Sequence, residues 1–154
     1  MKKLLEVKNL TKTFPVNGGF LKKSKKLTAV DGISFDVMEG ETLCLVGESG
    51  CGKSTLGRCI LQIIKPTSGE VIFDGVDLCK LDEKKMRPYR QYLQMIFQDP
   101  YASLNPRMTI RELIGAPVHA FKLAATSDEL DEKIREVCKV VGISEDWLNK
   151  YPHE

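Results

Sequence analysis

At residues 47–55 the chain reads Gly47-Glu48-Ser49-Gly50-Cys51-Gly52-Lys53-Ser54-Thr55, which fits the pattern G-x-x-x-x-G-K-[ST]. The stretch follows an apolar run at residues 42–46 that is typical of a buried strand, and it opens a helix-like segment over residues 55–64. A glycine-rich loop between a strand and a helix is the context that this pattern needs, so we expect a phosphate-binding loop. The alternative is a glycine-rich turn that carries a solvated lysine.

The chemistry of phosphate explains these residue types. Glycines at 47, 50 and 52 permit backbone conformations that residues with a Cβ resist. Several main-chain amides can then point at one anion at the start of a helix. Lys53 adds a charge that can reach the β- and γ-phosphates, and the Ser54 hydroxyl is placed to hold Mg²⁺.

Length and composition are those of one globular domain, or a fragment of one. The chain has 154 residues, of which 42% are hydrophobic and 29% charged. No apolar run approaches the ~20 residues of a membrane span, and the first residues lack the features of a secretory signal. Five cysteines without metal-site spacing indicate free thiols. We therefore expect a cytoplasmic protein.

The net charge of +2 is unevenly distributed. Eight lysines and a single glutamate lie in the first 26 residues, and Lys22, Lys23, Lys25 and Lys26 form a cluster. Such a patch can bind nucleic acid or an anionic membrane surface. The neighbouring Gly18-Gly19 favours a solvated loop tip instead.

The remaining pattern predicts strands, then helices. Short strands are expected at residues 5–10, 28–30, 33–37 and 70–73, with a loop at 15–26 and a turn at Asp74-Gly75. The early strands read as antiparallel, whereas a buried strand at 93–97 is expected to lie parallel to 42–46 because the connection is too long for a hairpin.

Helical signals dominate the second half of the chain. Residues 82–91 predict a short helix broken near Pro88, and residues 99–106 an ordered loop. Thr109 and Glu112 have capping-box spacing. Residues 127–141 form an amphipathic pattern that ends at Gly142, with one face made of Leu130, Ile134, Val137, Cys138 and Val141.

Three stretches together resemble the nucleotide-binding subunits of ABC transporters, and the resemblance covers the whole chain. They are residues 47–55, Met95-Ile96-Phe97-Gln98-Asp99-Pro100, and Tyr101-Ala102-Ser103-Leu104-Asn105-Pro106-Arg107-Met108-Thr109. The third is distinctive of the branch that serves oligopeptide, dipeptide and nickel importers. The resemblance implies the N-terminal part of an α/β P-loop NTPase (RecA-like) domain. An antiparallel β subdomain and a partial parallel core sheet would occupy about residues 1–98, and the Q-loop region with the start of a helical subdomain about 99–154.

The resemblance also implies roles for individual residues. Phe14 matches the aromatic residue that stacks on adenine; read from the sequence alone, it is a core residue. Gln98 matches the Q-loop glutamine, which senses Mg²⁺ and the γ-phosphate; otherwise it is a polar residue that ends a strand. Residues 99–116 match the region that meets the membrane permease subunits, with Tyr101 and Arg107 as anchors; the alternative is a solvated connector.

Several parts of the family's site are not in the sequence. The chain ends at Tyr151-Pro152-His153-Glu154, where the family's signature L-S-G-G-Q would follow almost at once. The aspartate that holds Mg²⁺, the catalytic glutamate and the switch histidine are also missing, and His119 and His153 lie in no matching context. We therefore assign no catalytic residue and expect ATP binding without hydrolysis by this chain alone. Unpaired strands should leave apolar surface exposed near 43–46 and 93–97, so the fragment should aggregate, melt at low temperature or require a partner.

The resemblance implies an ATP-binding subunit, or a fragment of one, that drives import of oligopeptides, dipeptides or a similar small solute. Its partners would be the permease subunits, a second ATP-binding subunit in a head-to-tail dimer and, indirectly, an extracytoplasmic solute-binding protein, without nucleic acid. It would lie on the inner face of the cell membrane. One alternative is a non-transport ABC ATPase that acts on nucleic acid or ribosomes. A small P-loop kinase is disfavoured, because no dense arginine cluster follows residue 107.

Overall fold

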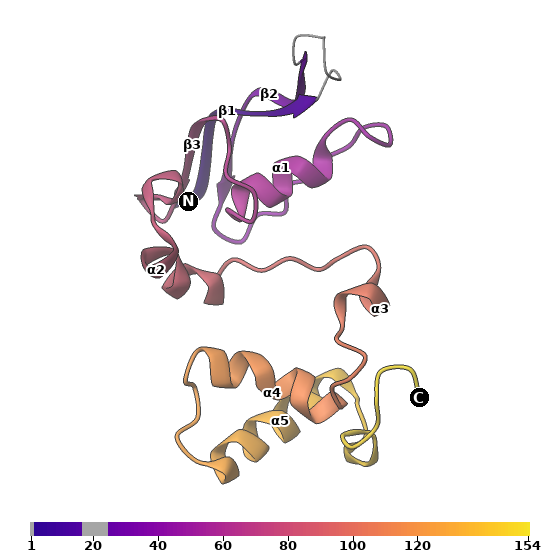
Figure 1. Cartoon of the computed structure of the whole chain (residues 1–154). Helices are drawn as coiled ribbons and strands as arrows, with labels where there is room; N and C mark the ends of the chain where they lie inside the picture. Colours follow the sequence, from indigo (N-terminus) through magenta and orange to yellow (C-terminus); the bar gives the residue numbers. More distant parts are fainter. Residues whose placement is uncertain (1, 17–24) are drawn as a thin grey trace. The chain divides into compact units, whose positions relative to one another are not determined.

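The computed structural model describes residues 2–16 and 25–154. They belong to two compact units, Met1–Gln94 and Met95–Glu154 (Figure 1). Each unit has its own hydrophobic core. In the described residues, no helix has both the length and the apolar character that a membrane span requires.

The first unit is built on an antiparallel sheet with the strand order β2-β1-β3-β4. Its strands are β1 (Lys3–Val16), β2 (Lys25–Met38), β3 (Ser68–Phe73) and β4 (Val76–Asp77). Asp74 and Gly75 form the expected turn, with φ angles of 47° and 82°. The predicted antiparallel strands are confirmed.

The sheet is larger than predicted. The strands expected at 28–30 and 33–37 are one continuous strand, β2, and residues 15, 16, 25 and 26 of the expected loop belong to β1 and β2. The long β1–β2 pairing explains this, because it runs from Lys3 opposite Met38 to Val16 opposite Lys25 and absorbs register shifts on the way. Residues 17–24 of the expected loop, including Lys22 and Lys23, lie outside the described residues.

The core of this unit lies between the sheet, helix α1 (Lys53–Ile60) and three short helical turns. The turns are η1 (Leu78–Lys80), α2 (Glu83–Met86) and η2 (Arg87–Gln91), and the change from α to 3₁₀ geometry at Arg87 matches the break expected near Pro88. The buried residues are Val7, Leu10, Val30, Leu56, Cys59, Val71, Leu78 and Met86.

Helix α1 is shorter than the predicted helix at 55–64. It ends at Ile60, and Gln62 adopts a left-handed conformation with φ 54°. The buried Gln62 side chain donates a hydrogen bond to the Cys59 carbonyl at 2.8 Å, and Arg90 donates to the carbonyls of Leu61 and Gln62. These bonds satisfy one carbonyl of the last helical turn and the two carbonyls that follow the end of the helix. Because the chain turns here, Ile63, within the predicted helix, lies beyond its end and is exposed.

The prediction of two parallel core strands is wrong for the described residues. Residues 42–46 and 93–97 form no strand, and Val46 and Ile96 are 94% and 97% exposed. A strand needs a neighbour that pairs with its amides and carbonyls, and no described segment pairs with either run. The expectation that both runs expose apolar surface is confirmed.

The second unit is helical. It contains α3 (Pro100–Ser103), α4 (Ile110–Ala120), α5 (Ser127–Val141) and η3 (Glu145–Trp147). The predicted helix at 127–141 is confirmed, and it ends at Gly142, whose φ is 74°. The expected loop at 99–106 contains the short helix α3, because the Asp99 side chain accepts a hydrogen bond from the Ala102 amide and starts a turn.

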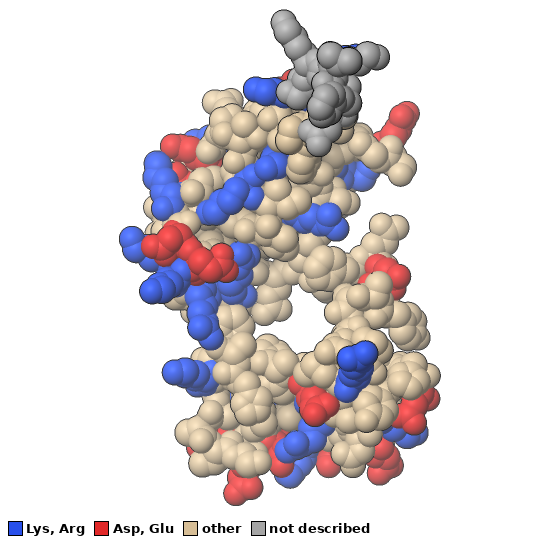
Figure 2. Space-filling model, viewed as in Figure 1, with Lys and Arg blue, Asp and Glu red and all other residues tan. Residues whose placement is uncertain are grey.

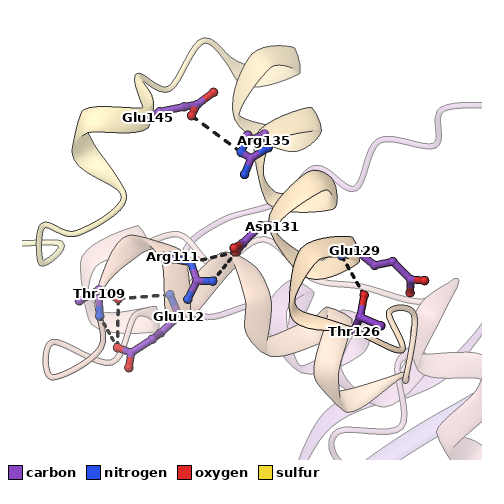
Figure 3. Close-up of polar contacts among 8 residues, drawn as sticks. All are labelled: Thr109, Arg111, Glu112, Thr126, Glu129, Asp131, Arg135 and Glu145. Atoms are coloured by element: carbon purple, nitrogen blue, oxygen red, sulfur yellow. Dashed lines mark hydrogen bonds and ion pairs between the residues drawn. The ribbon is translucent and has the colours of Figure 1, made fainter.

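The start of α4 is fully capped. Thr109 and Glu112 form the predicted capping box (Figure 3). In addition, the Ile110 amide donates to the Lys150 carbonyl and the Arg111 amide to the Leu148 carbonyl, both at 2.9 Å. The first amides of α4 are therefore all bonded, and residues 148–150 are tied to its N-terminus.

Helices α4 and α5 pack closely at Gly115. A Cβ at this position would lie 3.5 Å from Ile134 and 3.6 Å from Leu130. An ion pair between Arg111 and Asp131 joins the same two helices at the surface (Figure 3). Only part of the predicted apolar face of α5 is buried: Leu130, Ile134 and Cys138 are in the core, whereas Val137 and Val141 are exposed because the contact with α4 is narrow.

A comparison of substitutions at the buried Val7 and the exposed Val46 tests the exposure of residues 43–46. Val7→Ala removes side-chain volume from a position that is 1% exposed, so it should lower the free energy of unfolding by about 2 kcal/mol. Val46→Ala makes the same change at a 94% exposed position and should alter it by less than about 0.5 kcal/mol. Urea unfolding followed by circular dichroism measures both. Equal losses would mean that Val46 is buried in the folded protein.

Candidate nucleotide-binding site

The N-terminus of α1 presents free amides next to the glycine-rich loop. The Leu56 amide makes the first hydrogen bond of the helix, to the Gly52 carbonyl at 2.8 Å. The amides of Lys53, Ser54 and Thr55 precede this bond and have no acceptor within the helix. Together with the helix dipole they favour an anion at this end of α1.

Two glycines of the loop have the left-handed conformation that the sequence pattern predicts. Gly50 has φ 83° and Gly52 has φ 100°. A Cβ on Gly52 would also lie 2.1 Å from the Ala29 carbonyl oxygen of β2, so the loop rests directly on the neighbouring strand. Gly47 has a different reason to be glycine, because a Cβ there would lie 2.7 Å from the Cys51 sulfur.

The Lys53 side chain folds back over the loop. Its ammonium donates hydrogen bonds to the carbonyls of Gly47 and Glu48, at 2.6 and 2.7 Å, and lies 3.5 Å from Cys51 Sγ. A lysine ammonium has only donors, so phosphate oxygens can replace these carbonyls as acceptors. The charge is therefore held at the place where the helix amides also favour an anion.

A cavity of about 420 Å³ lies beside this loop. Its wall includes Thr28, Ala29 and Val30 of β2, the ammonium-bearing Lys53, and apolar side chains of the 42–46 run and of α1. The volume is within the range of small-molecule sites. Asp31 of β2 also lines the cavity, which thus combines one cation and one carboxylate with apolar side chains.

Phe14 lies on β1, which pairs with the strand that lines this cavity. Phe14 is opposite Leu27, and Thr13 is opposite Thr28. The Phe14 side chain is only half-buried and is not part of the buried core, and the Lys12 ammonium lies 5.0 Å from the centre of its ring. The role of Phe14 as an adenine platform stays a prediction.

Gln98 belongs to the second unit. It is exposed and lies at a bend between residues 93–97 and α3. Its role in sensing Mg²⁺ and the γ-phosphate therefore also stays a prediction.

The described residues contain no group of three or more His, Cys, Asp or Glu side chains placed to hold a metal. Mg²⁺ usually keeps few protein ligands and shares substrate phosphates. The exposed Ser54, second residue of α1, fits such a role as one hard oxygen ligand next to the phosphate position.

All five cysteines are free thiols, as predicted. Burial raises the pKa of the Cys59 and Cys79 thiols, which makes both less reactive. Cys51, in the loop, is exposed.

Sequence reasoning missed two residues that shape the site. Ala29 contributes a main-chain carbonyl under Gly52, and no sequence signal marks such a contact because it arises only from packing. Lys12 lies two residues before Phe14 on one strand, which places both side chains on the same face of the sheet. The two-residue spacing in the sequence could therefore have indicated that Lys12 lies beside Phe14.

The comparisons with known proteins agree with this geometry. A family model described as ABC transporter matches residues 30–153. The chain belongs to the ABC transporter family. The predicted family and its P-loop NTPase fold are confirmed.

Curated relatives are transport ATP-binding proteins. The chain is 45% identical over 153 residues to the oligopeptide transport ATP-binding protein AppF of Bacillus subtilis, covering 98% of the chain and 46% of the relative. It is 46% identical to OppF of the same organism (99% and 48% covered) and 43% identical to OppF of Escherichia coli (99% and 47%). The chain thus spans about half the length of these curated relatives.

Solved ATP-binding cassettes have the same fold. A dimeric cassette in a post-hydrolysis state, bound to ADP and Pi, matches with a TM-score of 0.80 and 27% identity over 97% of this chain and 62% of that one. The cbiO1 protein of Clostridium perfringens, part of an ABC transporter complex, matches with a TM-score of 0.73 and 25% identity over 99% and 55%.

Substitutions at Gly52 and Gly75 distinguish the effect of the Gly52–Ala29 contact from the cost of placing a Cβ at positive φ. Gly52→Ala adds a Cβ that meets the Ala29 carbonyl, so the loop must move; we expect loss of MgATP binding and destabilisation beyond about 1 kcal/mol. Gly75→Ala is the matched control, with φ 82° but open space around it, and should cost only about 1 kcal/mol and leave binding intact. Calorimetric titration and urea unfolding measure the two effects. Unchanged binding in Gly52→Ala would contradict the described loop.

Proposed function

We propose that the chain binds ATP with Mg²⁺ through residues 47–55, Phe14 and Gln98. We further propose that it forms part of an ATP-binding subunit that couples ATP binding and hydrolysis to import of oligopeptides, dipeptides or a similar small solute. The observation that carries the nucleotide proposal is the Lys53 ammonium, held on two loop carbonyls at the N-terminus of α1.

The loop geometry supports a mode of binding for the phosphates. Phosphate oxygens displace the carbonyls of Gly47 and Glu48 from the Lys53 ammonium and accept hydrogen bonds from the first amides of α1. The Ser54 hydroxyl would be one ligand of Mg²⁺, and Phe14 would offer a ring on which the base can stack. The role that we propose for Gln98 is to sense Mg²⁺ and the γ-phosphate.

The transport part of the proposal is supported by the relatives. Proteins named for oligopeptide and dipeptide transport match nearly the whole chain at 43–46% identity. A protein of this kind would lie on the cytoplasmic face of the membrane, where it meets permease subunits and, through them, an extracytoplasmic solute-binding protein. Dimeric solved cassettes support a second ATP-binding subunit as partner.

We propose residues 99–116 as the permease-facing segment. It is locally ordered, since Asp99 caps α3 and the Asn105 side chain accepts a hydrogen bond from the Arg107 amide. Tyr101 and Leu104 are nevertheless 76% and 40% exposed. Ordered backbone with exposed apolar side chains suits docking better than a solvated connector.

Charge supports this proposal over a nucleic-acid partner. Figure 2 shows acidic side chains interspersed with basic ones over the face in view, together with broad uncharged areas. Nucleic-acid surfaces are predominantly basic. Of the basic cluster, Lys22 and Lys23 lie outside the described residues, whereas Lys25 and Lys26 belong to β2.

Removal of the Lys53 charge tests the nucleotide site. Lys53→Ala should lower MgATP affinity at least about tenfold, because it removes a charged hydrogen-bond donor from the phosphates. Lys84→Ala, at an exposed lysine of α2, should leave affinity unchanged. Calorimetry on the folded chain measures both. A wild-type chain that ignores MgATP would refute the proposal, as would equal affinity in the two variants.

The same preparation tests hydrolysis. No residue that we assign to the site is a catalytic base, so phosphate release by the purified chain should stay at background. A steady-state ATPase activity that Lys53→Ala abolishes would overturn this expectation.

A further inference from the structure

The Phe14 ring carries a cation on one of its faces. The Lys12 ammonium lies 5.0 Å from the ring centre, within the range of a cation–π contact. The same ammonium donates a hydrogen bond to the Lys65 carbonyl at 2.7 Å, in the segment that follows α1. Lys12 is half-buried, so its side chain is held between the ring and this carbonyl.

The surrounding backbone fixes this arrangement. The Thr13 amide donates to the Thr67 hydroxyl at 3.0 Å, and the Thr67 amide donates to the Thr11 carbonyl at 2.8 Å. The segment that accepts the Lys12 hydrogen bond is therefore tied to β1 on both sides of Lys12. The ring and its cation are positioned before any ligand arrives.

We propose that Lys12 is a positioning residue of the nucleotide site, which orients Phe14 and leaves the opposite ring face for a purine base. This rests on the function proposed above. An aromatic face is negative, and a cation on one side draws electron density away from the other, which favours stacking of an electron-rich base. Holding the ring in one orientation also lowers the entropy cost of binding.

Lys12 acts on the base without contacting the phosphates. Strand β2 connects the two halves of the site: Leu27 and Thr28 pair with Phe14 and Thr13, and Thr28 and Ala29 line the cavity that contains Lys53. Lys12 itself is not among the residues that line this cavity. Substitution of Lys12 should therefore lower the affinity for ligands that have a base and leave the affinity for ligands that have phosphates alone unchanged.

The experiment compares MgATP with magnesium tripolyphosphate, by calorimetry on the full chain. Lys12→Gln keeps a donor for the Lys65 carbonyl but removes the charge. It should lower ATP affinity about two- to fivefold and leave tripolyphosphate affinity unchanged. Lys12→Arg keeps the charge and should bind ATP as tightly as the wild-type chain does. Lys8→Met removes the same charge from the same strand, where Lys8 pairs with Glu6, and should change neither affinity.

A double-mutant cycle tests the route through the ring. The single substitution Phe14→Leu should lower ATP affinity. The double variant, which adds Lys12→Gln, should show no further loss of ATP affinity. Equal losses for both ligands in Lys12→Gln, an unchanged ATP affinity, or additive losses in the cycle would each overturn the inference. If the wild-type chain binds tripolyphosphate as tightly as ATP, Phe14 is no base platform and the inference fails while the phosphate site stands. If it binds neither ligand, the proposed function itself fails.

Discussion

The position of the whole candidate site depends on one close contact, between Gly52 and the Ala29 carbonyl. Only a residue without a Cβ fits there, and the contact sets the N-terminus of α1 directly on β2. Hydrophobic burial of Leu56 and Cys59 holds the helix against the sheet, but burial alone is non-directional. The backbone contact supplies the direction, and it places the Lys53 ammonium and the free helix amides at one point.

The other end of α1 is fixed as firmly by different chemistry. Arg90 places a positive group on the carbonyls of Leu61 and Gln62, where the helix dipole is negative. The buried Gln62 amide adds a hydrogen bond to Cys59, although its own oxygen has no partner in the described residues. The helix that begins at the phosphate loop is thus constrained at both ends by residues far apart in the sequence.

Local signals in the sequence predicted local structure well. The loop at 47–52, the capping box at Thr109 and the helix that ends at Gly142 each depend on residues within a few positions of one another, and the structure has all three. The runs at 42–46 and 93–97 failed as strands because pairing depends on partners elsewhere. The end of α1 failed for a related reason, since Gln62 turns the chain by burying its amide. The family resemblance supplied the roles of Phe14 and Gln98, which their sequence surroundings alone do not indicate.

The main-chain bonds from Ile110 and Arg111 to Lys150 and Leu148 join two points that are distant along the chain. They close the stretch between them into a ring, within which α4 and α5 also pack on each other. The start of α4 is therefore connected to residues 148–150 directly, by a path that does not run along α5. A change in the backbone at residues 110–111 would thus alter the bonds of residues 148 and 150 as well as the cap of α4.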